Sequence, residues 1–128
     1  HLGAGDGDLA AARARLGPGR ILGASCYNRL DLAQAAVAAG ADYVAFGAAF
    51  ASATKPGAVR APLELYRTAR RALAARIVAI GGITVANAPA LVTAGVDALA
   101  VITALFDADD VARRAREFQS LFSRIESP

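Results

Sequence analysis

The stretch Ala39-Gly40-Ala41-Asp42-Tyr43-Val44-Ala45 recurs 55 residues later as Ala94-Gly95-Val96-Asp97-Ala98-Leu99-Ala100, and this repeat decides the fold class. In each copy a glycine follows a segment of helical length, as glycine does after the last turn of a helix. An aspartate and a continuous apolar run come next, and such runs are typical of strands buried on both faces. The repeat therefore indicates alternating strands and helices built around a parallel sheet.

The rest of the chain fits the same alternation. We expect strands over Arg20–Ala24, Asp42–Gly47, Ile77–Ile80 and Asp97–Ile102, and helices beginning near Leu9, over Leu30–Ala39, Pro62–Ala74 and Thr84–Ala94, and within Asp107–Ile125. Asp6 or Asp8, Asn28 and Thr84 are predicted to cap helices. The pattern is compatible with a barrel and with an open, doubly wound sheet. Because ligands bind at the carboxyl ends of the strands in both folds, the loops there are the candidate sites.

Length and composition favour one soluble domain. The chain has 128 residues, is 55% hydrophobic and 20% charged, and carries a net charge of +3. No apolar run approaches the roughly 18 residues of a membrane span, and the mixed, scattered charges argue against a nucleic-acid partner. The single cysteine, Cys26, excludes an internal disulfide and fits a reducing cytoplasm. Since the chain begins with His1 and contains no methionine, we expect its natural start to lie upstream.

Three loops have the composition of an anion site. Gly81-Gly82 joins a predicted strand to a predicted helix, where backbone N–H groups and the helix dipole favour a phosphate. Ile102-Thr103 follows the last strand in a similar junction, and phosphate sites of barrels recur after the final two strands. The long loop Ala48–Arg60 carries two hydroxyls and an ammonium in Ser52-Ala53-Thr54-Lys55, a plausible phosphate or pyrophosphate clamp.

Three further residues near strand ends need an interpretation. Ser25 is expected at the end of the first strand, with its hydroxyl facing the mouth of a barrel. Cys26 is a poor candidate nucleophile, because the only histidine is His1 and no Cys–His or Ser–His–Asp relay is evident. Asp6 either caps the first helix or, near a phosphate site, holds Mg²⁺, which binds one or two carboxylates together with substrate phosphates.

These segments, in this order and spacing, resemble thiamine-phosphate synthase over essentially the whole chain. The resemblance rests on His-Leu-Gly at 1–3, Asp6, Leu-Gly-Pro-Gly at 16–19, Gly-Ala-Ser at 23–25, Ala-Gly-Ala-Asp-Tyr-Val at 39–44, Ser-Ala-Thr-Lys-Pro-Gly at 52–57, Ala-Ile-Gly-Gly-Ile-Thr at 79–84 and Ala-Val-Ile-Thr-Ala-Leu-Phe at 100–106. It implies an α/β fold in which residues 1–128 form a single partial domain, about strands 4–8 of a (β/α)8 barrel, without the N-terminal strands.

The resemblance also implies the chemistry and the residues that perform it. The family couples hydroxymethylpyrimidine diphosphate to a thiazole phosphate with Mg²⁺, through a pyrimidine carbocation, and releases pyrophosphate. Asp6 then corresponds to a Mg²⁺ ligand, and Ser25 and Lys55 to catalytic contacts with the pyrimidine diphosphate. The contacts with thiazole phosphate correspond to Ser52, Ala53, Thr54, Gly82, Ile102 and Thr103. Two departures are Ala51-Ser52, where the family has proline-threonine, and Ala4-Gly5, where it has glutamine-glutamate.

Two alternatives remain open at this point. The related thiazole tautomerase is an isomerase with the same barrel and a similar phosphate pocket, and a non-catalytic phosphate-binding barrel is the third possibility. Asp6 together with Lys55 favours the synthase, because an isomerase expels no pyrophosphate. The resemblance places the family's basic motif and second metal carboxylate upstream of His1. We therefore expect residues 1–128 alone to be inactive and poorly soluble, and we leave open whether the complete protein is a homo-oligomer.

Overall fold

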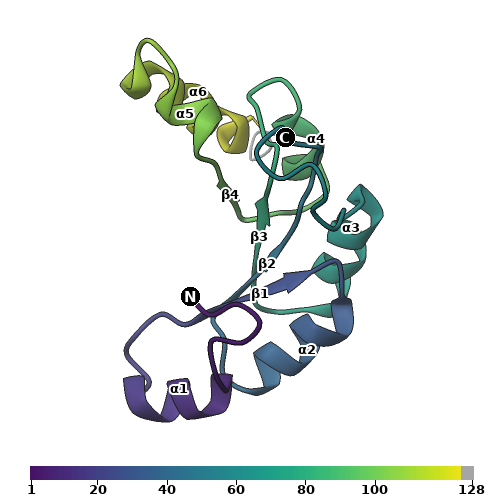
Figure 1. The fold of residues 1–128 in the computed structure, drawn as a ribbon, viewed down its shortest axis with the longest axis vertical. Coiled ribbons are helices and arrows are strands. Elements are labelled where there is room, and N and C mark those ends of the chain that lie inside the picture. Colours follow the sequence, from purple (N-terminus) through teal and green to yellow (C-terminus); the bar gives the residue numbers. More distant parts are fainter. Residues whose placement is uncertain (125–128) are drawn as a thin grey trace.

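The computed structural model describes residues 1–124 as one run of alternating strands and helices (Figure 1). The elements in chain order are α1 (Leu9–Leu16), β1 (Gly23–Tyr27), α2 (Leu30–Ala38), β2 (Tyr43–Phe46), α3 (Leu63–Ala72), β3 (Arg76–Ile80), α4 (Ala88–Thr93), β4 (Ala98–Ala100), α5 (Thr103–Phe106) and α6 (Val111–Ser123). The expected alternation is confirmed.

The four strands pair in sequence order, β1-β2-β3-β4, and every pair is parallel. A doubly wound sheet needs a point where the strand order reverses and the helices change face. Residues 1–124 contain no such reversal, and Figure 1 shows the helices following the outer side of a curved row of strands. Leu2 forms one further parallel bridge, with Ala24, so the N-terminal segment continues the row beside β1.

The hydrophobic core lies between the sheet and its helices. Alternate strand residues point into it, among them Ala24, Val44, Phe46, Ile77 and Ala79, all 2% exposed or less. The ring of Tyr66 on α3 packs edge-on against Phe46, with 5.9 Å between ring centroids, and its hydroxyl donates to the Phe46 carbonyl oxygen at 2.9 Å. Burial raises the pKa of Tyr66, so this hydroxyl remains a donor.

The opposite face of the sheet is covered by none of the described helices. Because side chains alternate along a strand, Ser25, Ala45, Val78 and Ile80 point to this second face. Ile80 is 44% exposed and Val78 is half-buried, although both lie on internal strands. The second face is therefore more open to solvent than the core face.

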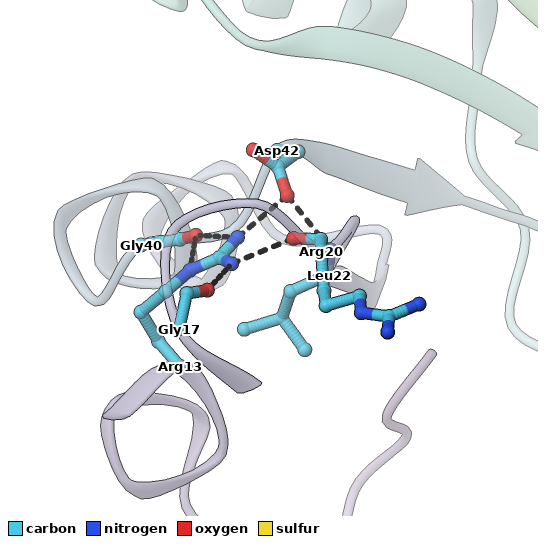
Figure 2. A network of polar contacts seen from close by, with 6 residues as sticks. All are labelled: Arg13, Gly17, Arg20, Leu22, Gly40 and Asp42. Atoms are coloured by element: carbon cyan, nitrogen blue, oxygen red, sulfur yellow. Dashed lines mark hydrogen bonds and ion pairs between the residues drawn. The ribbon is translucent and has the colours of Figure 1, made fainter. Parts of the chain in front are cut away.

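Arg13 on α1 ties together the amino-terminal ends of the first strands (Figure 2). Its guanidinium donates to the backbone oxygens of Gly17, Arg20 and Gly40 and pairs with the carboxylate of Asp42. The same carboxylate accepts the backbone N–H of Leu22 at 2.7 Å. These contacts lie at the amino-terminal end of the sheet, away from the candidate loops. In barrel folds, residues at this end usually contribute to stability rather than to catalysis.

Several element boundaries differ from the sequence prediction. The first strand is Gly23–Tyr27 rather than Arg20–Ala24: residues 20–22 precede the strand, and their hydrogen bonds go to Arg13, Asp42 and Tyr43. Asn28 does not cap α2, whose first flanking residue, Arg29, makes no side-chain cap hydrogen bond. The fourth strand is shorter than predicted, Ala98–Ala100. Asp8 caps α1 and Asp110 caps α6, while Ile125 lies outside the described residues.

Candidate phosphate-binding site at the strand ends

Gly81 and Gly82 follow β3, and the loop after β2 packs directly on them. Both glycines have positive φ, +100° and +65°. A Cβ at Gly82 would lie 2.6 Å from the carbonyl oxygen of Phe50 and 2.7 Å from that of Ala51, and one at Gly81 would lie 2.7 Å from Ala48. Only glycine combines this conformation with this approach. The pair therefore brings the loop after β2 and the loop after β3 together.

Backbone hydrogen bonds hold these two loops in place. Ala49 donates to the Ile80 carbonyl oxygen at 2.9 Å, and Phe50 donates to that of Gly81 at 3.0 Å. On the helix side, Thr84 and Asn87 exchange side-chain and backbone hydrogen bonds, and the Asn87 amide also donates to the Gly82 carbonyl oxygen. The predicted helix cap at Thr84 is therefore wrong: Thr84 closes the turn before α4, which begins at Ala88 with Asn87 as its N-terminal flanking residue.

The segment Ser52-Ala53-Thr54-Lys55 extends from this junction as an exposed turn. The Ser52 hydroxyl accepts the backbone N–H of Thr54 at 3.2 Å, and Ala58 donates to the Lys55 carbonyl oxygen at 3.1 Å. Thr54 and Lys55 are exposed, and Ser52 is half-buried. The two flanks of the segment are fixed to the sheet through Ala49 and through Ala61, which donates to the Ala48 carbonyl oxygen. The turn that carries Lys55 is thus anchored to the sheet on both sides.

Ser25 lies in the middle of β1 rather than at a strand end, which corrects the sequence prediction. Its neighbours Ala24 and Cys26 are buried in the helix-facing core, so its hydroxyl is on the second face. There Ser25 Oγ is 2.8 Å from His1 Nε2, and His1 Nδ1 is 2.8 Å from the Tyr43 hydroxyl. A residue of the N-terminal segment, one of β1 and one of β2 thus meet in a single polar chain.

Asp6 lies in the loop between the N-terminal bridge and α1, where its side chain accepts the backbone N–H of Gly3 at 2.7 Å. It does not cap α1, which is the role of Asp8. In residues 1–124 no three His, Cys, Asp or Glu side chains gather as a metal site. A single carboxylate fits Mg²⁺ only where substrate phosphates complete the coordination, which is the usual arrangement for this ion.

Ile102 and Thr103 follow β4, at the same end of the sheet as the other candidate loops. Ile102 precedes the short helix α5 and is 73% exposed, and Thr103 begins that helix. None of the hydrogen bonds among residues 1–124 joins them to Gly82. The structure thus brings Gly82 and the Ser52–Lys55 segment together through the Phe50 and Ala51 backbone, and places Ile102-Thr103 one strand further along.

Cys26 is not available as a nucleophile. It is 1% exposed, and burial raises the pKa of its thiol to about 11, so the thiolate is scarce near neutral pH. His1 is not adjacent to it in the polar chain, which ends on Ser25. The pairing of His1 with Ser25 was not predicted, because the sequence shows no Cys–His or Ser–His–Asp relay that would assign a role to its only histidine. The contact between His1 and Ser25 depends on the bridge between Leu2 and Ala24, and no local sequence motif predicts that bridge.

The order of strands, the helices on one side and the glycine-lined loops at the carboxyl ends define a barrel-like parallel βα-repeat protein. Residues 1–105 match the family described as thiamine monophosphate synthase. The chain therefore belongs to the thiamine monophosphate synthase family, as its motifs led us to expect. In residues 1–124 no helix is both long and apolar enough to cross a membrane.

Individual relatives agree with the family assignment. The chain is 59% identical over 123 residues to thiamine-phosphate synthase of Methylobacillus flagellatus, covering 96% of this chain and 58% of that protein. It is 60% identical over 122 residues to thiamine-phosphate synthase of Chromobacterium violaceum, covering 95% and 58%. A solved thiamine phosphate pyrophosphorylase of Pyrococcus furiosus superposes with a TM-score of 0.85 at 32% identity, over 98% of this chain and 59% of that one. The chain thus spans somewhat over half the length of these relatives.

Proposed function

We propose that the complete protein is a thiamine-phosphate synthase, which couples hydroxymethylpyrimidine diphosphate with a thiazole phosphate and releases pyrophosphate. The observation that carries the proposal is the packing of Ala48–Ala51, the residues just before Ser52–Lys55 in the same loop, against Gly81-Gly82, together with membership of the family. It sets the loop that carries Lys55 against the glycine pair that we propose as a phosphate site. A leaving diphosphate and a retained phosphate need such neighbouring anion sites.

Residues 1–128 are best explained as a single partial domain, about strands 4–8 of a (β/α)8 barrel. Two features support this. The second face of the sheet leaves Ile80 exposed, and β4 is the last strand in the sheet of residues 1–124. Beside β4 runs an apolar groove lined by Leu99, Val101, Leu105, Phe118 and Phe122. A strand added beside β4 would cover this groove and begin to close the barrel.

The proposed roles follow the chemistry of each group. The C–O bond between the pyrimidine methylene and the diphosphate breaks heterolytically, and the electron pair leaves with the diphosphate. The thiazole nitrogen then donates its lone pair to the methylene carbon and forms the new C–N bond. Lys55 and Ser25 donate hydrogen bonds to the diphosphate as its charge develops, and they act as the catalytic residues. No protein nucleophile is needed, in keeping with the burial of Cys26.

We assign thiazole phosphate to the part of the site formed by the Ser52–Thr54 turn and by the loops that follow β3 and β4. Ser52, Ala53 and Thr54 line it with a hydroxyl-bearing turn, and Gly82, Ile102 and Thr103 would offer backbone N–H groups to the phosphate. The Asp6 carboxylate would hold Mg²⁺ together with the diphosphate oxygens. When bound, the ion neutralises negative charge on the departing diphosphate. We place the reaction in the cytoplasm and leave a homo-oligomer open.

Thiazole tautomerase is the second candidate, because it shares the fold and a phosphate pocket. Replacing Asp6 with alanine separates the two in the full-length protein. Under the synthase proposal, Asp6→Ala abolishes Mg²⁺-dependent release of pyrophosphate, whereas a tautomerase would lose little activity. Measured pyrophosphate release that is indifferent to Asp6 would reject the assigned metal role.

A further inference from the structure

The polar chain on the second face links three residues that come from three different segments. His1 Nε2 lies 2.8 Å from Ser25 Oγ, and His1 Nδ1 lies 2.8 Å from the Tyr43 hydroxyl. The rings of His1 and Tyr43 also stack, with centroids 5.6 Å apart and an interplanar angle of 22°. Both ring nitrogens are thus engaged, and the imidazole orientation is fixed by a stack as well as by two hydrogen bonds.

Hydrogen bonds also hold the backbone around His1, Ser25 and Tyr43 in place. Leu2 donates to the Gly23 carbonyl oxygen at 3.0 Å and accepts from Ser25 at 2.9 Å, which holds the N-terminal segment against β1. The Tyr43 ring lies on Gly23, since a Cβ there would be 1.9 Å from the ring. Glycine at position 23 is what allows the ring to lie across β1 and its hydroxyl to reach His1.

The distances allow two directions for the hydrogen bonds, and the ligand selects between them. Diphosphate oxygens only accept, so Ser25 must donate its hydroxyl hydrogen to them. Ser25 Oγ must then accept from His1, which requires the proton on Nε2. In a neutral imidazole the other nitrogen, Nδ1, is then an acceptor. The Tyr43 hydroxyl is the donor within reach of it, and it therefore favours this tautomer.

We propose that His1 is a positioning residue for the Ser25 hydroxyl, and that Tyr43 holds His1 in the tautomer that keeps Ser25 a donor toward the pyrimidine diphosphate. This inference rests on the proposed function and deepens it. His1 itself acts through Ser25 and makes no assigned contact with substrate.

A double-mutant cycle in the full-length protein tests the proposal, with kcat and KM measured for each substrate. His1→Ala is expected to lower kcat/KM for hydroxymethylpyrimidine diphosphate by up to about 10-fold, the scale of one hydrogen bond between neutral groups, and to leave KM for thiazole phosphate unchanged. In a Ser25→Ala background the same His1→Ala change should cost nothing further, because its target is gone. Tyr43→Phe should behave in the same way with a smaller loss.

Two further variants separate positioning from packing. His1→Gln keeps an N–H donor and should recover part of the loss, whereas His1→Leu keeps apolar bulk over Tyr43 and should not. Ser120→Ala on α6, remote from the second face, is the matched serine control. Independent, additive losses from His1→Ala and Ser25→Ala, or a His1→Leu variant more active than His1→Gln, would overturn the inference while leaving the proposed function intact. A wild-type protein that forms no thiamine phosphate would overturn both.

Discussion

Asp42 and Asp97, 55 residues apart, occupy equivalent places in the sheet. Each carboxylate accepts, at 2.7 Å, the backbone N–H of a residue 20 positions earlier, Leu22 for Asp42 and Ile77 for Asp97. Each also pairs with an arginine, Arg13 or Arg70. The repeat in the sequence is thus a repeat of one structural device, which ties the start of a strand to the strand before it.

The device explains why both repeats carry glycine two positions before the aspartate. A Cβ at Gly40 would lie 2.9 Å from Arg13 Cγ, and a Cβ at Gly95 would lie 2.9 Å from Arg70 Cγ. Both glycines also have positive φ, +106° and +102°. The glycine therefore ends one helix and at the same time leaves room for the arginine stem from another helix.

Removing the second device should destabilise the fold. Asp97→Ala leaves the Ile77 N–H and the Arg70 guanidinium without their shared acceptor, which should lower the free energy of unfolding by about 1–3 kcal/mol. Urea denaturation of the full-length protein measures this. Asp109→Ala, at an exposed position before α6, is the control and should change stability by less than about 0.5 kcal/mol. Equal effects of the two changes would contradict the structural role of Asp97.

Asp42 should give the fold a contribution that depends on pH. The Leu22 backbone N–H, followed by the Arg13 guanidinium, lowers the pKa of the Asp42 carboxyl below its usual value. A lowered folded-state pKa means that the contribution is complete above the unfolded-state value of about 3.9 and is lost as pH falls through the folded-state pKa. The difference in Tm between wild type and Asp42→Asn should therefore be largest near neutral pH and shrink below about pH 4. A difference that grows on acidification would contradict this account.

Gly82 should not tolerate a side chain. Gly82→Ala combines a φ of +65° with a Cβ 2.6 Å from the Phe50 carbonyl oxygen, so the loop after β2 must move away. We expect a loss of about 1–3 kcal/mol in stability and a raised KM for thiazole phosphate. Gly19→Ala meets no atom within 4 Å and is the matched control. If Gly82→Ala bound thiazole phosphate as the wild type does, the assigned phosphate pocket would be wrong.

Lys55 should matter for turnover more than for folding, because its side chain is exposed and sits in a turn. Lys55→Ala should lower kcat by about 10²–10³, the usual cost of removing a donor to a developing negative charge. Lys55→Arg should retain more activity, since it keeps the charge. Arg71→Ala, on the exposed side of α3, serves as the control for loss of a cation. Unchanged kcat in Lys55→Ala would remove Lys55 from the catalytic machinery.

The sequence was sufficient for the fold class and for the family, because both depend on local patterns. Apolar runs, helix-ending glycines and the repeat around Asp42 and Asp97 are all short-range signals. The boundaries of the first and last strands were wrong, since Leu22 and Asp97 are placed by long-range hydrogen bonds that no local pattern encodes. The choice between a barrel and a doubly wound sheet likewise needed the strand order.

The candidate site was only partly predictable for the same reason. Gly82 and the Ser52–Lys55 segment could be identified by residue type, and the structure adds that Phe50 and Ala51, just before that segment, pack on Gly82. Ser25 was expected at a strand end and lies within β1. Its link to His1 and Tyr43 depends on the pairing of the N-terminal segment with β1, which only the three-dimensional structure supplies.

The central claim, synthesis of thiamine phosphate, is tested most directly by product formation. Purified full-length protein is incubated with hydroxymethylpyrimidine diphosphate, thiazole phosphate and Mg²⁺, and thiamine phosphate and pyrophosphate are quantified by mass spectrometry and a coupled assay. The account predicts that the two products form in equal amounts, only when both substrates are present, and that Lys55→Ala slows both together. Absence of thiamine phosphate from a folded, Mg²⁺-supplied protein would contradict it.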